Sequence, residues 1–350
     1  MINKTSRQTS QMTARLLEIN IKGIAQLVPI ALVILVVNML VLVVFLKTKN
    51  LRTPANYVLF SLAVNDFMTG ALNIPLFIFV GFTPIISSNT VRLHLGILLT
   101  AVHTLTAIIS VYHVAIATLE KYLSIIRPIT HRLIKKRTVI KVCLMVWFIS
   151  AVIGFIPFAW TDESNHPEGA KYFISYIIFC FVAVFFFPYI FMLYAFLKIL
   201  RAIASGAGQS GTNETKEKHK KKLARERKCI MLFVAMATTF LICWFPWFLL
   251  QLLYSLKFAP EALDVPAHVF ALVRYITSVI NPLLYTLLRP DFYAAQKDLF
   301  KRVGLPVFPG ECGLCHLRRE ERQGTHIFRE DRVRFTLSED IKTLSNEPGE

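Results

Sequence analysis

Residues 229–256 read CIMLFVAMATTFLICWFPWFLLQLLYSL and contain no charged side chain. The hydrocarbon core of a bilayer is about 30 Å thick, and about 20 apolar residues in an α-helix cross it. An α-helix also satisfies its own backbone hydrogen bonds, which lipid cannot do. The stretch therefore predicts one membrane-spanning helix.

Six further stretches of comparable length and apolarity accompany this one, so seven spans are expected. They are residues 24–46, 56–80, 93–123, 142–160, 172–197 and 265–288. The whole chain of 350 residues is 55% hydrophobic and only 17% charged, and short loops leave no room for a soluble domain. We expect an all-α membrane protein whose residues 24–288 form a seven-transmembrane helix bundle.

Lys and Arg concentrate in alternate loops of this predicted bundle. Residues 47–52, 127–141 and 201–228 are rich in them, whereas the other three loops hold only Arg92, Lys171 and Lys257. Basic loops stay in the cytoplasm, so we expect a multi-pass plasma-membrane protein with an extracellular N-terminus and a cytoplasmic C-terminus. The net charge of +17 then reflects topology and attraction to membrane lipids, and nucleic-acid binding is not expected.

The two ends of the chain differ in character from the spans. Residues 1–23 form a polar extracellular segment without the apolar core of a signal peptide, and Asn3 begins an Asn-Lys-Thr glycosylation pattern. Residues 289–302 predict an amphipathic membrane-surface helix, with Phe292 on its apolar face. Residues 303–350 predict a disordered cytoplasmic tail, in which Cys312 and Cys315 are either palmitoylated or unmodified.

Polar side chains inside the spans are costly in lipid and need partners. Asp66 lies in the middle of the second span, and Asn38, Ser110, Ser278 and Asn281 lie at suitable depths to reach it. Together they predict either a pocket for a small cation such as sodium or a purely structural hydrogen-bond network. No other metal or cofactor is expected.

Two prolines within spans point to hinges, and their surroundings are more telling than the prolines themselves. Pro246 follows Cys243-Trp-Phe, and Pro282 opens Pro-Leu-Leu-Tyr after Asn281. With Asn38, Leu-Ala-Val-Asn-Asp66, Glu120-Lys-Tyr122, Trp147 and Pro188, these motifs occur in the order typical of one family. From residue 24 to about residue 302 the chain resembles the rhodopsin-like (class A) G-protein-coupled receptors.

The resemblance implies a receptor that binds an extracellular small-molecule, lipid or peptide ligand among its helices. It implies that outward movement of the sixth helix activates a heterotrimeric G protein, with arrestin as a further expected partner. It places Trp244 below the ligand, makes Asp66 and Ser110 a sodium site, and has Val111 repack on activation. The residues expected to serve activation and coupling are Glu120, Lys121, Tyr122, Pro188, Glu226, Phe240, Pro246, Pro282 and Tyr285.

Three positions depart from the family pattern. Lys121 replaces an arginine and so offers a point charge, expected to pair with Glu120 or Glu226, where the family has a planar fork. Phe196 replaces a tyrosine, and Gly96 stands where a disulfide cysteine is usual. Because of Lys121 and Phe196, a receptor-like membrane scaffold with weak or no signalling remains an alternative function. The third suggests a resemblance to the melanocortin, cannabinoid and lysophospholipid receptor group.

The expected ligand site centres on His103 and Arg274. His103 stands where amine receptors carry an aspartate, and the seventh span has no lysine to hold retinal. Arg274 and His103 predict a site for an anionic head group, but Arg274 could instead reach outward to the membrane surface or pair with Glu261 or Asp264. The other expected ligand contacts are Thr104, Trp244, Trp247, Gln251 and Tyr275.

The sequence disfavours two other classes of membrane protein. A transporter is disfavoured because no repeated halves are visible, and a membrane enzyme because no paired ligands or nucleophile motif occur within the spans. We therefore expect no enzymatic activity.

Overall fold

The structure is a computed structural model, and it describes residues 2–82, 88–163, 167–206, 213–256, 258 and 260–304. For some of these residues the backbone is described but the side chain is not: 2–20, 89, 160–163, 167–170, 206, 213–229, 260–262, 264, 287, 288, 290 and 303.

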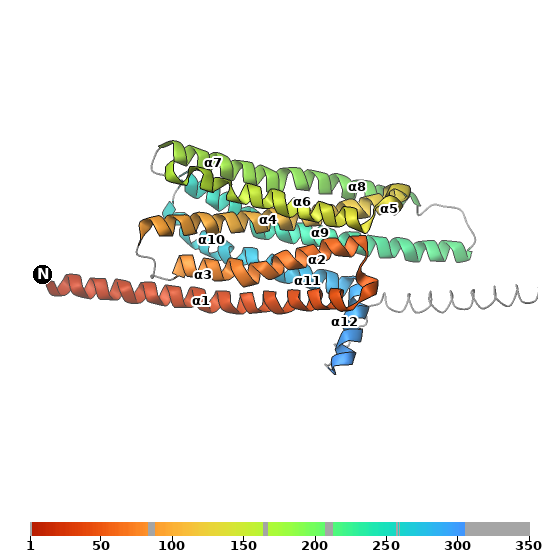
Figure 1. Ribbon diagram of the computed structural model, residues 1–350, viewed down its shortest axis with the longest axis horizontal. Coiled ribbons are helices and arrows are strands. Elements are labelled where there is room, and N and C mark those ends of the chain that lie inside the picture. Colours follow the sequence, from red (N-terminus) through yellow and green to blue (C-terminus); the bar gives the residue numbers. More distant parts are fainter. Residues whose placement is uncertain are drawn as a thin grey trace, which may run out of the picture.

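Every element in these ranges is helical (Figure 1). The long helices and the segments that continue them are α1 (Ile2–Lys47), α2 (Pro54–Met68), η2 (Thr69–Asn73), α3 (Ile74–Phe82), α4 (Asn89–Ile126), α6 (Lys136–Phe155), α7 (Pro167–Phe181), η4 (Val182–Phe186), α8 (Phe187–Gly206), α9 (Asn213–Ser255), α10 (Pro260–Val273), η5 (Arg274–Ile276) and α11 (Thr277–Leu288). The shorter elements are η1 (Lys49–Leu51), α5 (Pro128–Leu133), η3 (Ile156–Glu163) and α12 (Pro290–Val303).

Seven of the described helices are long and apolar enough to cross a membrane. They run from Ile21–Lys47 to Val265–Thr286, close to the spans expected from the apolar runs. The predicted seven-helix bundle is confirmed. The one large difference is α1, which begins at Ile2 although residues 2–20 carry no apolar pattern. Extending an existing helix needs no new nucleus, so a polar segment can continue it.

Two spans change their helical pitch just before a proline. A π-helical turn, η2, precedes Pro75, and another, η4, precedes Pro188. Proline has no N–H and its ring crowds the carbonyl four residues earlier, which a wider turn relieves. At the predicted hinges Pro246 and Pro282, by contrast, α9 and α11 continue without a change of helix type.

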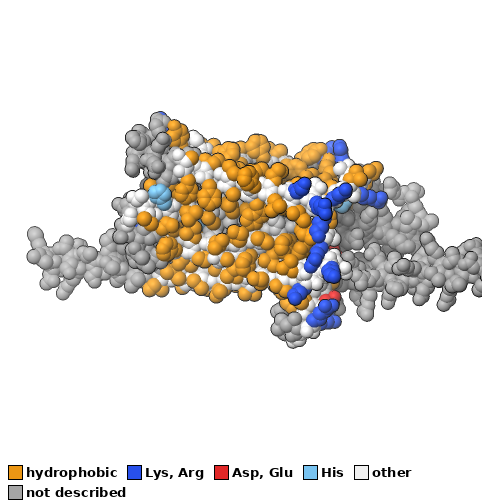
Figure 2. All heavy atoms as spheres, viewed as in Figure 1, with side chains coloured by type: hydrophobic (Ala, Val, Ile, Leu, Met, Phe, Trp, Pro, Cys, Tyr) orange, Lys and Arg blue, Asp and Glu red, His pale blue; other side chains and the backbone are white. Residues whose placement is uncertain are grey.

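The surface of the bundle is apolar around its middle and basic at one end (Figure 2). Phe148 is 70% exposed, and Ile242 and Phe187 are each 62% exposed, as expected for side chains that face lipid. Lys and Arg side chains gather at the end where α5 and α12 lie (Figures 1 and 2).

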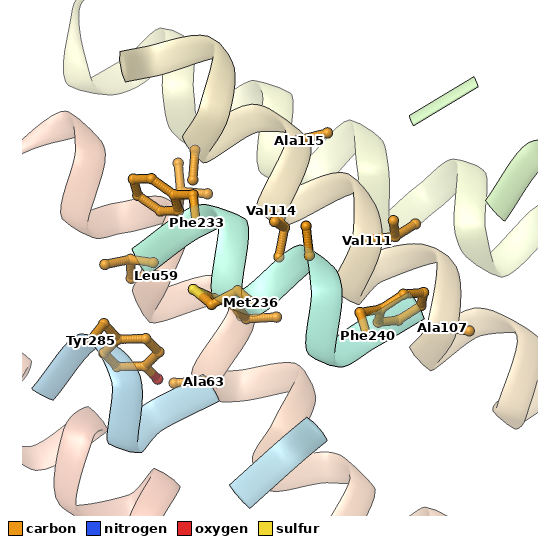
Figure 3. Packing of buried hydrophobic residues seen from close by; sticks show 14 of the residues in the cluster. Leu59, Ala63, Ala107, Val111, Val114, Ala115, Phe233, Met236, Phe240 and Tyr285 are labelled. Atoms are coloured by element: carbon orange, nitrogen blue, oxygen red, sulfur yellow. The ribbon is translucent and has the colours of Figure 1, made fainter. Parts of the chain in front are cut away.

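The largest buried core cluster runs along the bundle and reaches the basic end. Phe240 of α9 packs beside Val111 and Ala107 of α4, while Met236 lies between Val114 and Ala63 (Figure 3). At the end of the bundle, Phe292 of α12 is buried and its ring centroid lies 5.8 Å from that of Tyr285. The apolar face predicted for residues 289–302 thus packs, through Phe292, on α11.

Candidate functional site

A buried arginine organises the half of the bundle that lies away from the basic end. The tight turn η5 interrupts the seventh span and brings the consecutive residues Arg274 and Tyr275 into the interior, where both side chains are fully buried. Arg274 Nη2 donates to His103 Nε2 at 2.9 Å and to the Tyr275 hydroxyl at 3.1 Å. The Tyr275 hydroxyl in turn donates to Asn73 Oδ1 at 3.2 Å. One hydrogen-bonded cluster therefore joins the second, third and seventh spans.

Aromatic rings surround the guanidinium of Arg274. Its Cζ lies 3.9 Å from the ring centroid of Trp247, 4.8 Å from that of Tyr275 and 5.4 Å from that of Phe77. Cation–π attraction of this kind partly replaces the water that a buried cation loses. Arg274 Nε and Nη1 are nonetheless buried without a hydrogen-bond partner among the described residues.

This geometry settles one of the alternatives for Arg274. The side chain does not reach outward to the membrane surface, because it is 0% exposed and its bonds hold it toward α4. The side chains of Glu261 and Asp264 lie outside the described residues.

The other expected ligand contacts lie near this cluster to different degrees. Trp247 stacks on Arg274, and its ring centroid is 6.1 Å from that of His103. Thr104 is buried next to His103 on α4. Gln251 is half-buried on α9, one turn beyond Trp247, and no bond from its side chain to Arg274 or His103 is found among the described side chains.

A second set of contacts connects the arginine cluster to the core. Thr277 donates to the backbone carbonyl of Arg274 at 2.7 Å, and Trp244 Nε1 donates to the Thr277 hydroxyl at 3.2 Å. The Trp244 ring stacks on Phe240, with centroids 5.6 Å apart and an interplanar angle of 15°. Phe240 belongs to the core packing in Figure 3. The backbone at Arg274 is therefore connected to the α4–α9 contact through Thr277 and Trp244.

Asp66 has the partners expected on the seventh span. Its carboxylate accepts from Ser278 Oγ at 2.8 Å and from Asn281 Nδ2 at 3.2 Å, and all three side chains are buried. Asn38 Nδ2 donates to the backbone carbonyl of Ser278 at 2.9 Å, which ties the first span to the same region.

Ser110 makes its side-chain contact with Asn65, and the sodium site that the resemblance implies for Asp66 and Ser110 stays a prediction. The Ser110 hydroxyl accepts from Asn65 Nδ2 at 2.9 Å, and Asn65 also donates to the Thr106 carbonyl at 3.2 Å, so Ser110 pairs with the residue next to Asp66. The direct partners of the Asp66 carboxylate are on α11 instead. Asn65 lies one residue before Asp66 on α2, which turns its side chain toward α4.

The expected coupling residues lie at the basic end. Lys121 Nζ is 3.6 Å from Glu120 Oε2, so the first of the two predicted pairings is present. His131 Nε2 is 2.8 Å from Glu120 Oε1. The side chain of Glu226 lies outside the described residues, and so does the alternative pairing. Tyr122 packs at the edge of a small apolar cluster with Phe196.

The activation residues within the bundle are buried, except Pro246, which is half-buried. Pro188 and Phe240 line the fifth and sixth spans, and Tyr285 is fully buried with a hydroxyl that has no partner among the described residues. Pro246 and Pro282 lie within α9 and α11.

Several residues of these networks were not singled out from the sequence. Phe77, Thr106, Thr277 and His131 are ordinary helix residues that only the packing brings to the site. A similar case is Ser61, whose hydroxyl meets Trp147 Nε1 at 3.0 Å and His113 Nε2 at 2.8 Å. A histidine within an apolar span, His113, is the one signal for this last contact that the sequence contains.

The predicted modification sites fall outside what the structure describes: the Asn3 side chain, Cys312 and Cys315. The cysteine side chains that are described, those of Cys143, Cys180 and Cys243, are buried and unpaired.

Comparison with known proteins identifies the family. Residues 37–285 match the family described as 7 transmembrane receptor (rhodopsin family). Trace amine-associated receptor 1 from Mus musculus is 26% identical over 294 residues, which cover 77% of this chain and 85% of that receptor. Pinopsin from Columba livia is 27% identical over 275 residues, which cover 73% of this chain and 74% of pinopsin. The 5-hydroxytryptamine receptor 1D from Rattus norvegicus is 26% identical over 328 residues, which cover 76% and 84% respectively. The chain therefore belongs to the rhodopsin family of seven-transmembrane receptors and is a G-protein-coupled receptor, which confirms the class that its motifs predicted and places it among receptors and not enzymes.

Proposed function

We propose that this receptor binds its ligand between α4, α9 and α11 around Arg274 and activates a heterotrimeric G protein at the opposite, basic end. The observation that carries the proposal is the unbroken series of contacts from Arg274 through Thr277 and Trp244 to Phe240. A ligand that moves the arginine moves residues that pack directly on the core between α4 and α9.

The surface charge supports the orientation that we propose in the membrane. Lys and Arg side chains gather at the end that carries α5 and α12 (Figure 2). Basic residues near the ends of spans favour the cytoplasm, so this end faces the G protein and the start of α1 faces outward in the plasma membrane. The amphipathic α12 then lies at the inner membrane surface, where its basic residues Lys301 and Arg302 face anionic lipids.

The movement expected on activation is an outward shift of the cytoplasmic half of α9. Phe240 and Met236 hold α9 against α4 in the core of Figure 3, and these contacts are apolar and non-directional. Such a packed interface has discrete alternative arrangements, so a small displacement of Trp244 can select a different one. Pro246 supports the shift because α9 lacks one backbone hydrogen bond there.

The polar network at Asp66 supplies a second control point. Asp66, Ser278, Asn281, Asn38 and Ser110 offer carboxylate, hydroxyl and amide oxygens, the donor type that hard cations prefer. Buried oxygens of Asn38 and Asn65 have no hydrogen-bond partner among the described residues, so these residues fit a sodium ion as an allosteric regulator. Bound there, the ion would supply positive charge to a buried carboxylate.

The coupling end carries the argument for a different function, a receptor-like scaffold without signalling. Lys121, which stands where the family has arginine, is paired with Glu120, and Glu120 also contacts His131. These contacts hold the lysine side chain near the end of α4. A lysine keeps the positive charge but not the planar fork. Signalling is the preferred function because the connection from Arg274 to the core does not depend on Lys121. Arrestin is proposed as a second cytoplasmic partner on the same surface.

We propose a small molecule or a lipid, in preference to a peptide, as the ligand. Gly96 and the lack of any cysteine between residues 144 and 179 support a relationship to the melanocortin, cannabinoid and lysophospholipid receptors. The relatives named above include an amine receptor and an opsin. This chain has histidine, not an acidic residue, at position 103 and no lysine in the seventh span, so we propose neither an amine nor retinal as its ligand.

A panel of G-protein dissociation assays tests this function. Cells producing the chain are compared with cells producing a surface-expressed relative, with each Gα type in turn and with lipid, nucleoside and peptide extracts. We expect at least one Gα type to respond above mock-transfected cells. Silence across the panel, with normal surface expression, would establish the scaffold instead.

A further inference from the structure

Arg274 carries hydrogen-bond donors that the protein does not use. The guanidinium has five N–H bonds, and the acceptors found for it, His103 Nε2 and the Tyr275 hydroxyl, both contact Nη2. Nε and Nη1 have no acceptor among the described residues, although the side chain is 0% exposed. Buried donors without acceptors are rare in folded proteins and point to a missing partner.

The charge of Arg274 also has no counter-charge among the described side chains. No acidic side chain that the structure describes is paired with it, and Asp66 bonds to Ser278 and Asn281, one and two helical turns farther along the same span. A buried cation is strongly unfavourable unless an anion accompanies it. The aromatic rings of Trp247, Tyr275 and Phe77 soften this cost, but they accept no N–H bond in the guanidinium plane.

The neighbouring groups are arranged to hold the guanidinium and leave its donors free. His103 Nε2 accepts from Arg274 and also lies 3.2 Å from the Tyr275 hydroxyl, so it fixes one edge of the guanidinium. The Tyr275 hydroxyl donates a hydrogen bond to Asn73 Oδ1, and Asn73 Nδ2 donates to the Thr106 hydroxyl at 3.2 Å. The buried N–H groups of this cluster that lack an acceptor among the described residues are those of Arg274, and a cationic donor favours an acceptor with negative charge.

We propose that the ligand of this receptor is a monoanion whose carboxylate accepts from an unpartnered N–H of Arg274, at Nε or at Nη1, with an apolar body against the aromatic side chains. This inference names the ligand class of the site and so rests on the proposed function. A carboxylate supplies both the charge and the in-plane acceptors, whereas a protonated amine would meet a like charge. Trp247 covers the guanidinium face and is itself half-buried, so it is the side chain that moves to admit the head group.

Matched ligands that differ only in charge test the ligand class. The purified receptor is placed in lipid discs of neutral phosphatidylcholine, and its thermal unfolding is followed with hexanoate, hexanamide or hexylamine at constant sodium chloride. Saturating hexanoate should raise the unfolding temperature by about 5 °C or more, and the amide and the amine should leave it unchanged. Equal shifts with hexanoate and hexanamide would overturn the proposal.

A longer pair, dodecanoate and dodecanamide, distinguishes an aqueous carboxylate from one that enters from the membrane. A larger shift with dodecanoate than with hexanoate assigns a lipid source, and the reverse assigns an aqueous one. Both results support the carboxylate class. If raising sodium chloride alone reproduces the shift, the site takes a small inorganic anion and the proposal is wrong.

Variants at two arginines locate the effect. Arg274→Gln should lose the hexanoate shift, and Arg274→Lys, which keeps the charge but not the fork, should weaken the apparent affinity about tenfold or more. Arg289→Gln is the matched control. Arg289 also has a buried Nη1 without a partner among the described residues, but it lies at the cytoplasmic end. The hexanoate shift of this variant should equal that of the wild type. A shift that survives in Arg274→Gln would refute the assignment.

The unfolding assay contains no G protein, so the two proposals fail separately. A hexanoate shift without G-protein activation would contradict the proposed signalling and leave the carboxylate site standing. Activation by an uncharged ligand, without any hexanoate shift, would contradict the carboxylate site and leave the proposed signalling standing.

Discussion

Single buried side chains decide how this receptor holds its interior together. Arg274 and Asp66 are both fully buried, but they differ in how their hydrogen-bonding capacity is used. Asp66 receives donors from Ser278 and Asn281, whereas Arg274 keeps two nitrogen atoms without acceptors among the described residues. We interpret the first residue as part of the internal framework and the second as the point of ligand contact.

The donor that Ser278 gives to Asp66 should be worth measurable stability. Ser278→Ala removes a 2.8 Å hydrogen bond to a buried carboxylate, so the free energy of unfolding should fall by about 2 kcal/mol. Thermal unfolding of the purified receptor measures this. Ser255→Ala is the control, because that hydroxyl bonds only to the Gln251 carbonyl in its own helix and its loss should change stability little. Equal effects would show that the Ser278 bond carries no special weight.

The residues of the candidate site were predictable from the sequence only where a costly group stands in a span. Arg274, His103 and Asp66 stand out because charged and polar side chains are expensive in lipid. Thr277 and Thr106 do not stand out, since threonine is common in membrane helices and its partner depends on how the helices pack. The pairing of Ser110 with Asn65 was missed for the same reason.

At the scale of the elements, apolar runs predicted the spans but not their internal irregularities. A run of uncharged residues fixes the length that lipid can cover, so the span boundaries agree within a few residues for most of the seven. The π-turns before Pro75 and Pro188 were not predicted, because proline in a membrane helix can be accommodated in several ways. The turn η5, which presents Arg274 and Tyr275 together, has no sequence signal that we can identify.

Close packing of α6 on α4 depends on a glycine. A Cβ added at Gly154 would lie 2.8 Å from the backbone oxygen of Ala101, and a backbone atom cannot move aside cheaply. Gly154→Ala should therefore separate the two helices and lower the free energy of unfolding by about 1–3 kcal/mol. Thermal unfolding in lipid discs would detect the change.

Gly96 on α4 provides the matched substitution. Nothing lies within 4 Å of a Cβ added there, so Gly96→Ala should stabilise the helix slightly, by up to about 1 kcal/mol. The two substitutions thus have opposite expected signs. If both destabilise equally, tight α4–α6 packing is not the cause.

At the scale of the whole molecule, the signal must travel from the arginine cluster to the basic end. The outer half supplies charge chemistry at Arg274, the middle supplies apolar packing around Phe240, and the inner end supplies the Glu120 contacts. On the proposed function, ligand recognition and G-protein contact lie in different parts of one helical bundle and are coupled through α4 and α9.

The point charge at Lys121 should limit the strength of coupling. Lys121→Arg restores a planar fork with more donors at the same place, so G-protein activation at saturating ligand should rise severalfold. Lys141→Arg, an exposed lysine at the same end of the bundle, should leave activation unchanged and serves as the control. A Lys121→Arg receptor with unchanged output would show that the lysine is no handicap.

Nucleotide exchange by a reconstituted receptor tests the central claim most directly. Purified receptor in lipid discs is combined with the Gα type that responded in the cellular panel, and the exchange rate is measured with and without the carboxylate that gave the larger unfolding shift. We predict that the carboxylate accelerates exchange in the wild type and in Arg289→Gln but not in Arg274→Gln. Equal acceleration in Arg274→Gln, at equal receptor concentration and folding, would contradict the account that a carboxylate at Arg274 drives signalling.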